Sequence, residues 1–176
     1  DDIPPKPGTQ MRIHSLVPDG APIELCAYYP RFAEYYPEAE LQTKRWFQRH
    51  VAPDWVIADI GANVGLYAML FARLAPQGHV HAFEPTDTAQ LLRANLAAAG
   101  AANVSVHDVA LGAAEGARED AIYRIWGAAP ETRRYAFATL DGFVREAGLT
   151  RLDCVKIDVD GFDLEVLKGA RDTLAR

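Results

Sequence analysis

The spacing of apolar residues changes from strand-like to helical within the first fifty positions. Residues 11–17 and 21–27 each form a strand-like apolar run, and a Pro-Asp-Gly turn sequence at 18–20 separates them. This arrangement predicts a β-hairpin. From 38 to 50 the apolar residues follow a helical spacing, and Pro53 ends the helix. The N-terminal part is therefore expected to hold an irregular lead-in, a hairpin and a helix.

After Pro53 the pattern alternates between short apolar runs and helical segments. The expected strands cover 55–60, 79–83, 104–106, 121–126, 136–140 and 154–159, and the expected helices cover 63–75, 87–99, 141–146 and 163–175. Strands that alternate with helices at this spacing form a mostly parallel, doubly wound α/β sheet with right-handed crossovers. We therefore divide the chain into an N-terminal unit, 1–53, and a sheet domain, 54–176. Ligands of such sheets bind beyond the carboxyl ends of the strands.

A glycine-rich loop follows the first strand of this sheet, in the sequence Asp59-Ile-Gly-Ala-Asn-Val-Gly65. Gly61 permits a sharp turn, and Gly65 permits close packing of the next helix. The dinucleotide fingerprint requires glycine where Asn63 stands, and the Lys-Ser/Thr pair of a phosphate loop is absent. Asp59 would repel phosphate and suits a cationic ligand such as S-adenosylmethionine (SAM), which carries an ammonium and a sulfonium. Asn63 either caps the helix or contacts the ligand.

Acidic residues also follow the next two strands. Glu84 lies 19 residues beyond Gly65 and could accept hydrogen bonds from both ribose hydroxyls of an adenosine. The alternative is a solvated carboxylate at a helix entry. Asp108 could accept a hydrogen bond from the adenine amino group or be a simple turn residue. Acids at three successive strand ends, beside a glycine loop, indicate an adenosine site more specifically than any one of them.

Lys156 and Asp158 share one face of the last expected strand. A lysine in an interior strand needs a charged partner, since an unpaired buried charge is costly. Asp158 or Asp59 could be that partner. One interpretation is a structural ion pair. The other places Asp158 at the mouth of a pocket, beside the methyl group being transferred.

Five segments together resemble the FkbM family of SAM-dependent methyltransferases. They are DIGANVGLYAMLFAR (59–73), HAFEP (81–85), ALG (110–112), TLDGF (139–143) and KIDVDGFDLEVLKGA (156–170), and the match in order and spacing runs over about 36–172. The resemblance implies a Rossmann-like class I methyltransferase sheet that binds SAM, and O-methylation of hydroxyls on sugars or polyketide-type natural products. The resemblance implies that Asp59, Gly61 and Gly65 frame the methionine part of SAM, with Glu84 at the ribose and Asp108 at the adenine. Ala62 and Asn63 of the same loop are also expected to bind the cofactor. The chain departs from the family where Asp160 and Asp163 stand in place of the more usual glutamates.

Composition narrows the partners. With 18 Lys+Arg against 24 Asp+Glu, a dedicated nucleic-acid or anionic-membrane binder is disfavoured. No apolar run approaches the roughly 20 residues of a membrane helix. Two cysteines cannot make a disulfide framework, so we expect a reducing, cytoplasmic setting. His79 and His81 are interpreted as ordinary strand histidines, and no metal is expected.

The chain length of 176 residues suits one domain but is short for this fold. A class I methyltransferase sheet normally has seven strands, and those after 154–159 are missing. We expect a continuation of the chain, or a partner such as a second copy, to cover the free edge of that strand. The chain also lacks an initiating Met, so we expect a fragment or a processed form.

The expected reaction is in-line methyl transfer from SAM to a small hydroxyl-bearing molecule. Asp158 is predicted to take or orient the hydroxyl proton, with Lys156 positioning it. Two other functions stay open: an RNA or protein methyltransferase, with a thin basic patch at Arg118 and 133–134, and a non-catalytic SAM-binding module. Asn63 argues against an NAD-dependent dehydrogenase. Tyr-Tyr-Pro occurs twice, at 28–30 and 35–37, either by chance or as an aromatic lid over a pocket.

Overall fold

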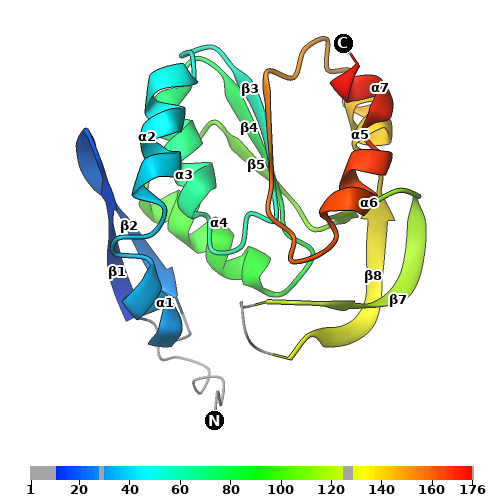
Figure 1. The fold of residues 1–176 in the computed structure, drawn as a ribbon, viewed down its shortest axis with the longest axis horizontal. Helices are drawn as coiled ribbons and strands as arrows, with labels where there is room; N and C mark the ends of the chain where they lie inside the picture. The colour runs from blue at the N-terminus through cyan, green and yellow to red at the C-terminus, as the bar shows by residue number, and fades with distance from the viewer. Residues whose placement is uncertain (1–10, 28–29, 125–128, 176) are drawn as a thin grey trace.

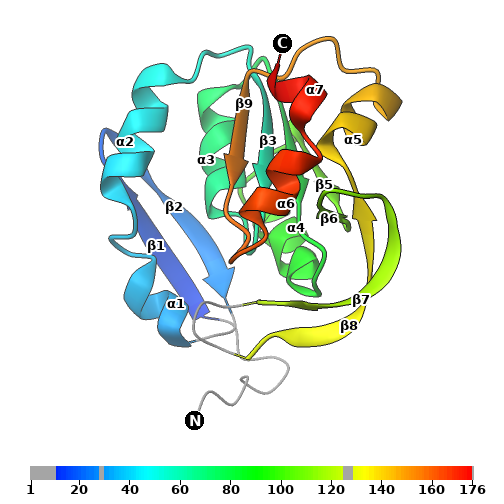
Figure 2. The same ribbon diagram turned by 45° about the vertical axis from the view of Figure 1, so that its right-hand side comes forward.

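A four-stranded parallel sheet forms the centre of the molecule. The computed structural model describes residues 11–27, 30–124 and 129–175. The sheet has the order β5-β4-β3-β9, with β3 at Val56–Ile60, β4 at His79–Phe83, β5 at Val104–His107 and β9 at Cys154–Ile157. The chain steps outward from β3 to β5 and then returns to place β9 on the other side of β3 (Figure 2). This confirms the Rossmann-like α/β fold and puts the reversal of strand order between β3 and β9, where ligands bind in such sheets.

Two long helices and the N-terminal hairpin lie on one side of this sheet (Figure 1). The helices are α3 (Leu66–Leu74) and α4 (Thr88–Ala98), and the hairpin consists of β1 (Met11–Val17) and β2 (Gly20–Ala27), joined antiparallel. α1 (Pro30–Tyr35) and α2 (Leu41–His50) follow the hairpin. β2 packs on both α3 and α4, because its inward positions carry apolar side chains such as Ile23 and Leu25. The predicted hairpin and helix are confirmed.

Buried polar groups hold this N-terminal layer together and join it to the sheet domain. The Lys44 ammonium is fully buried and donates to Ser15 Oγ at 2.8 Å and to the Leu16 carbonyl at 2.9 Å. The Asn95 side chain on α4 acts like a strand partner of Cys26: it accepts from the Cys26 N–H at 2.8 Å and donates to its carbonyl at 3.0 Å. One cluster of buried apolar side chains runs from Ile13 in the hairpin to α4. The two predicted units thus share a core.

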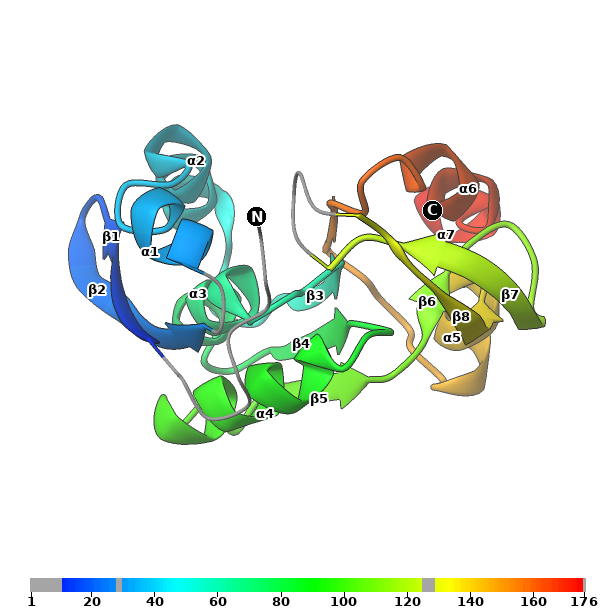
Figure 3. The same ribbon diagram turned by 90° about the horizontal axis from the view of Figure 1, so that it is seen from below.

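The other side of the sheet carries a small second sheet and three short helices (Figure 3). The second sheet has the order β6-β8-β7, with β6 at Ala110–Leu111, β7 at Gly116–Ile122 and β8 at Glu131–Ala138. The helices are α5 (Leu140–Glu146), α6 (Asp163–Lys168) and α7 (Arg171–Leu174). They cover Ala58 and Ile60 of β3 with an apolar cluster around Leu140 and Val166. The long β7–β8 hairpin extends past the carboxyl ends of the central strands.

Several expected boundaries were wrong. The strand expected at 121–126 is β7, which begins at Gly116, and 125–126 lie outside the described residues. The strand expected at 136–140 is β8, Glu131–Ala138, and the helix expected at 63–75 begins at Leu66. The strand expected from 154 to 159 ends at Ile157, and the backbone then turns with positive φ at Asp160 and Gly161. The helix expected over 163–175 is two helices. It breaks at Gly169, whose carbonyl accepts from Asp141 N–H at 2.9 Å and whose missing Cβ would lie 2.0 Å from the Gly112 carbonyl oxygen.

The outer edge of β9 has no strand beside it within the described residues, where β9 pairs with β3 alone. Leu164, Leu167 and Leu174, on the helices α6 and α7, are also exposed. The covering of this edge by further chain or a partner stays a prediction. Within the described residues, no helix has the length and apolar character needed to cross a membrane. Cys26 and Cys154 are not joined in a disulfide.

Candidate active site

Two adjoining cavities open at the carboxyl ends of the central strands. The first, which we call the narrow cavity, has a volume of about 70 Å³, and the second, the wide cavity, about 680 Å³. Gly61, Asn63, Asp158 and Asp160 line both. These four residues follow β3 and β9, so the cavities meet where the strand order reverses. This is the location that the fold predicts for a ligand.

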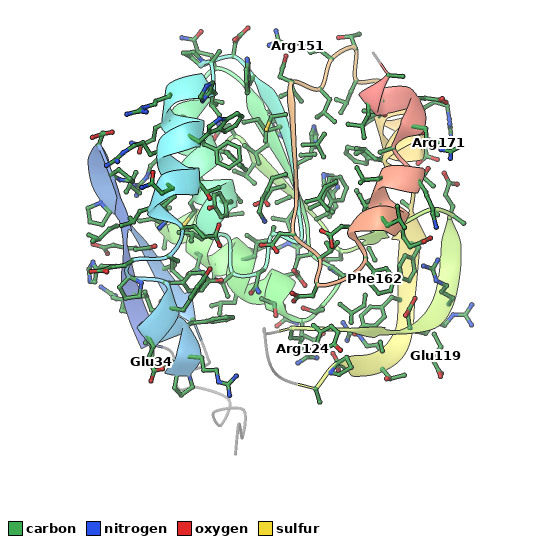
Figure 4. All side chains as sticks on the ribbon, viewed as in Figure 1. Glu34, Glu119, Arg124, Arg151, Phe162 and Arg171 are labelled. Atoms are coloured by element: carbon green, nitrogen blue, oxygen red, sulfur yellow. The ribbon has the colours of Figure 1, made fainter. Side chains whose placement is uncertain are left out.

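The narrow cavity has largely apolar walls. One wall consists of strand ends and the residues after them, and the opposite wall belongs to the β7–β8 hairpin. Its lining besides the shared residues is Ile60, Phe83, Glu84, Pro85, Val109, Ala110, Leu111, Ile122, Tyr123, Phe137, Val159 and Phe162. Figure 4 shows Phe162 near the turn below the strands, between β9 and the hairpin. Among the described residues that line this cavity, Glu84 is the one charged side chain besides the two shared aspartates.

The wide cavity has polar, aromatic and charged walls. It lies between the α1 segment, the start of α3 and the end of β9. Its lining besides the shared residues is Arg31, Phe32, Glu34, Tyr35, Tyr36, Glu40, Ala62, Leu66, Tyr67 and Lys156. The second Tyr-Tyr-Pro therefore contributes its tyrosines to a pocket wall, as one of the two interpretations expected, while residues 28 and 29 lie outside the described part.

Glu40 is fixed in this wall by two tyrosines. Tyr35 Oη donates to its Oε1 at 2.9 Å, and Tyr67 Oη donates to its Oε2 at 2.5 Å. Burial, helped by the Glu40 charge, raises the pKa of Tyr35 to about 12 and that of Tyr67 further, so both hydroxyls keep their protons. Glu40 also adopts a left-handed backbone with φ of 52°. Such strain in a residue other than glycine persists only where surrounding contacts hold it.

The glycine loop has the backbone geometry that its sequence predicts. Gly61 has φ of 78°, and a Cβ there would lie 2.0 Å from the Asp158 carbonyl oxygen. Gly65 has φ of 98°, and a Cβ there would lie 2.5 Å from Leu92. The backbone N–H groups of Gly61 and Ala62 both donate to the Phe83 carbonyl at 3.0 Å. The loop is thereby fastened to the end of β4.

Asn63 does not cap α3, which has Gly65 at its N-cap and no side-chain cap. Its Nδ2 instead donates to the Arg124 carbonyl at 3.3 Å, which links the loop to the β7–β8 hairpin. Its Oδ1 is buried and accepts no hydrogen bond from the described residues. Because Asn63 lines both cavities, this oxygen is an acceptor without a donor at their junction. The capping role is absent, and the ligand contact of Asn63 stays a prediction.

Lys156 forms the centre of an ion-pair group with two aspartates. Its Nζ lies 3.0 Å from Asp59 Oδ1 and 3.7 Å from Asp158 Oδ2. Asp59 is fully buried and lines neither cavity, whereas 63% of the Asp158 side chain is exposed. Lys156 and Asp59 form an ion pair. Among the described residues, neither Asp59 carboxylate oxygen accepts a hydrogen bond of good geometry.

Burial shifts both members of the inner pair. It raises the pKa of the Asp59 carboxyl, and the Lys156 charge opposes that shift. Burial also acts to lower the pKa of Lys156, but the charges of Asp59 and Asp158 outweigh it and raise the pKa. Lys156 therefore keeps its charge, with Asp59 behind it and Asp158 at the cavity mouth. Both partners considered from the sequence are present.

Glu84 is buried at the narrow cavity, with 7% of its surface exposed. Its Oε2 accepts from the Asn63 backbone N–H at 3.0 Å, and its Oε1 accepts from Thr86 N–H at 3.0 Å and Thr86 Oγ1 at 2.6 Å. Burial raises the pKa of its carboxyl, and these hydrogen bonds oppose the shift. A solvated helix-entry carboxylate does not describe this residue. The three hydrogen bonds fix its orientation and leave acceptor capacity on Oε2.

Asp108 lies outside both cavities. Its carboxylate makes a two-pronged contact with Arg93, at 2.9 Å and 3.0 Å, and 60% of its side chain is exposed. The following residues, Val109 and Ala110, line the narrow cavity in its place. The predicted contact of Asp108 with adenine stays a prediction that this arrangement does not support.

The histidines of the sheet contact one another and a serine. His79 Nε2 lies 2.8 Å from Ser105 Oγ, and His81 Nδ1 lies 3.2 Å from His107 Nε2. In the described part of the chain, no three His, Cys, Asp or Glu side chains are grouped as metal ligands would be.

Comparison with known proteins identifies the family. Residues 59–176 match the model described as the methyltransferase FkbM domain. This chain belongs to the FkbM methyltransferase family. The match begins at Asp59 and includes the glycine loop, Glu84, Lys156 and Asp158, so it covers nearly all of the strand-end residues described above. The α1 wall of the wide cavity lies outside it.

Two solved structures resemble this chain in fold. A methyltransferase FkbM from Methylobacillus flagellatus KT has a TM-score of 0.53 at 19% identity, over 70% of this chain and 31% of that one. A precorrin-6y C5,15-methyltransferase from Geobacter metallireducens GS-15 has a TM-score of 0.50 at 20% identity, over 77% of this chain and 57% of that one. In sequence, AMB antimetabolite synthetase AmbE from Pseudomonas aeruginosa is 30% identical over 68% of this chain, which spans only 8% of the synthetase.

Proposed function

We propose that this FkbM-family domain transfers a methyl group from SAM to a hydroxyl of a small molecule. The observation that carries the proposal is the pairing of two different cavities at one strand-order reversal. A buried, oriented carboxylate, Glu84, faces the narrow apolar cavity, and the Lys156–Asp158 pair faces the wide one. The lining of the first suits one end of a nucleoside, since its volume of about 70 Å³ is too small for a whole one, and the second suits acid–base work on an acceptor.

The residues present fit SAM. Glu84 has acceptor capacity for ribose hydroxyls, and the apolar walls at 109–111 and Phe137 suit a flat adenine ring. Asn63 Oδ1 is a buried acceptor without a donor at the junction of the cavities. The ammonium and hydroxyl groups of SAM could donate the hydrogen bond that Asn63 Oδ1 does not receive from the described residues. When bound, SAM supplies a methyl group on a sulfonium, which is already a good leaving group.

The chain's own contribution is alignment and proton handling. Asp158 and Asp160 are exposed carboxylates that line both cavities, and Asp158 is the one in contact with Lys156. We therefore assign to Asp158 the removal or orientation of the acceptor hydroxyl proton. Lys156 positions it through their contact at 3.7 Å. Asp59 is fully buried behind Lys156, and its carboxylate holds the Lys156 ammonium in place.

Replacing Asp158 tests this assignment. Asp158→Asn keeps the shape but removes the base, so we expect turnover to fall about 10²- to 10⁴-fold. The affinity for S-adenosylhomocysteine (SAH), the demethylated product, should stay unchanged in calorimetry. Asp163→Asn, on a residue that lines neither cavity, is the matched control. Full turnover in Asp158→Asn would remove Asp158 from the mechanism.

We assign the acceptor to the wide cavity. Phe32, Tyr35, Tyr36 and Tyr67 give it the aromatic surface on which sugar or polyketide rings pack, and its volume of about 680 Å³ suits a small molecule. The similarity to a synthetase named for an antimetabolite supports a natural product as the acceptor class. A screen of hydroxyl-bearing sugars and polyketide alcohols, with methyl-labelled SAM, tests this class directly.

Two alternatives differ from this proposal, one in the acceptor and one in the absence of catalysis. An RNA acceptor would need basic residues available for phosphate, but Arg133 contacts Asp87, and Arg118 contacts Asp120 and stacks on Phe137. A non-catalytic SAM-binding module would bind SAH in calorimetry and transfer no methyl group to any compound of the screen. We expect both binding and transfer, in the protein as it exists at full length.

A further inference from the structure

One aspartate outside both cavities fastens the wall of the narrow cavity. Asp87 follows β4 and precedes α4, and each of its carboxylate oxygens contacts a different arginine of the β7–β8 hairpin. Oδ1 lies 2.9 Å from Arg133 Nη1, and Oδ2 lies 3.1 Å from Arg124 Nη2. Arg133 Nη2 also donates to the Pro85 carbonyl at 3.1 Å. We call this group of Asp87, Arg124 and Arg133 the hairpin clamp.

The clamp joins the two sides of the narrow cavity. Ile122, Tyr123 and Phe137 of the hairpin segment form one wall, and Glu84 and Pro85 form the other. Arg124 follows Tyr123 directly, and its carbonyl accepts from Asn63 Nδ2 at 3.3 Å. The hairpin is thus tied to the segment after β4 through side-chain charges and to the glycine loop through a hydrogen bond. The width of the cavity depends on where these contacts hold the hairpin.

The charges of the clamp are partly open to solvent. The exposed fraction of the side chain is 57% for Asp87, 27% for Arg124 and 35% for Arg133. Glu131 of β8 contacts both arginines as a second acid. The hydrogen bond from Arg133 lowers the pKa of the Asp87 carboxyl, so the clamp is fully charged at neutral pH. Salt screens ion pairs that are this exposed.

We propose that Asp87 is a positioning residue that sets the affinity of the narrow cavity for the nucleoside part of SAM and SAH. The inference rests on the proposed function, since it assumes that the nucleoside binds there. Asp87 acts through the hairpin and not by contact, because it lines neither cavity. A consequence separates this role from a merely structural one: the affinity for SAH depends on ionic strength through the clamp, although SAH carries no net charge.

The size of the effect follows from the exposure. Asp87 takes part in two exposed ion pairs, and pairs of this kind are weak. Removing its charge should therefore weaken SAH binding about 2- to 30-fold, which corresponds to about 0.4–2 kcal/mol. Asp87→Glu keeps the charge and should retain most of the affinity.

Calorimetric titration of SAH at 50 and 500 mM NaCl tests the proposal on the wild type, Asp87→Asn, Asp87→Glu and Asp54→Asn. Asp54 is the matched control: it pairs with Arg151 at 3.0 Å, its side chain is 56% exposed, and it lines neither cavity. Figure 4 shows Arg151 at the end of the sheet opposite Arg124. We expect Asp87→Asn to bind more weakly at low salt, the wild type to approach it at high salt, and Asp54→Asn to match the wild type at both.

Three outcomes would overturn the proposal. Asp87→Asn could bind SAH as tightly as the wild type at 50 mM NaCl, it could keep the wild-type salt dependence, or Asp54→Asn could lose as much affinity. If Asp87→Asn does not fold, Arg133→Gln replaces it, because it removes the other member of the 2.9 Å contact between Asp87 and Arg133. The expected loss of SAH affinity and of its salt dependence is the same. A wild type that fails to bind SAH would overturn the proposed function, and this inference with it, which distinguishes the two failures.

Discussion

The two cavities of the cleft are built from different kinds of structure. The narrow cavity has walls of strand ends and a β-hairpin, mostly apolar, with one buried carboxylate that three hydrogen bonds orient. The wide cavity has a wall from α1 and the segment after it, with exposed charges and tyrosines. Segments distant in the sequence frame the narrow cavity, whereas one wall of the wide cavity comes from a single local stretch, 30–40. Under the proposed assignment, the cofactor cavity is therefore fixed by the fold, and the acceptor cavity can vary with a short stretch of sequence.

The largest expected effect concerns the ion pair beside both cavities. Lys156→Met would leave the fully buried Asp59 without its cation. Breaking a buried pair in this way costs about 3–5 kcal/mol of unfolding free energy. Urea denaturation measures the loss, and the double variant Asp59→Asn/Lys156→Met should recover much of it, since no charge is left unpaired. A single variant as stable as the wild type would show that the pair does not support the cleft.

The next effect should be confined to the narrow cavity. Glu84→Gln keeps the size of the side chain but removes the charge that is proposed to face the ribose hydroxyls. Hydrogen bonds to a charged group contribute about 1.5–3 kcal/mol, so SAH affinity should fall about 10- to 100-fold. Calorimetry measures the affinity, and the KM for the acceptor at saturating SAM should not change. If the acceptor KM rose instead, the assignment of the two cavities would be reversed.

The smallest effect should be confined to the wide cavity. Glu40→Gln keeps an oxygen that can accept the hydrogen bond from Tyr35 but removes the negative charge from the cavity wall. We expect the KM for the acceptor to rise about 2- to 5-fold, which is the size of one exposed charge interaction. Steady-state kinetics with the best compound of the hydroxyl screen measures it. Glu38→Gln, in the same segment but not in the lining, is the control. A change in SAH affinity with an unchanged KM would contradict the comparison.

Much of the fold could be predicted from the sequence because its signals are local. The alternation of apolar runs and helical segments places β3, α3, β4 and α4 within a few residues of their observed bounds. The glycines at 61 and 65 indicate a turn and a close approach that the structure contains. Where the prediction was wrong, distant contacts decide: the last helix breaks at Gly169 because Gly112 and Asp141 are packed against it.

The candidate site could be predicted only on the strand side. Parallel strands bring their carboxyl ends to one edge, so Glu84, Lys156 and Asp158 could be expected together. Glu40 and the hairpin clamp had no such signal, because nothing in the local sequence shows that Tyr67 reaches Glu40, or Asp87 reaches Arg133. Asp108 illustrates the limit of the rule: it follows a strand as expected, but Arg93 holds its carboxylate away from the cavities.

The buried Lys44 has a consequence for how this domain could change its acceptor. Its ammonium ties α2 to β1, and Asn95 ties β2 to α4, so the segment that carries α1 and Glu40 is anchored at both ends in the common core. A chimera that exchanged residues 30–40 alone would keep these anchors, whereas one that exchanged the hairpin as well could lose Ser15 Oγ, one of the two acceptors of the buried Lys44 ammonium. If the acceptor binds in the wide cavity as proposed, new acceptor ranges are therefore more accessible by grafting the short wall than by swapping the whole N-terminal unit.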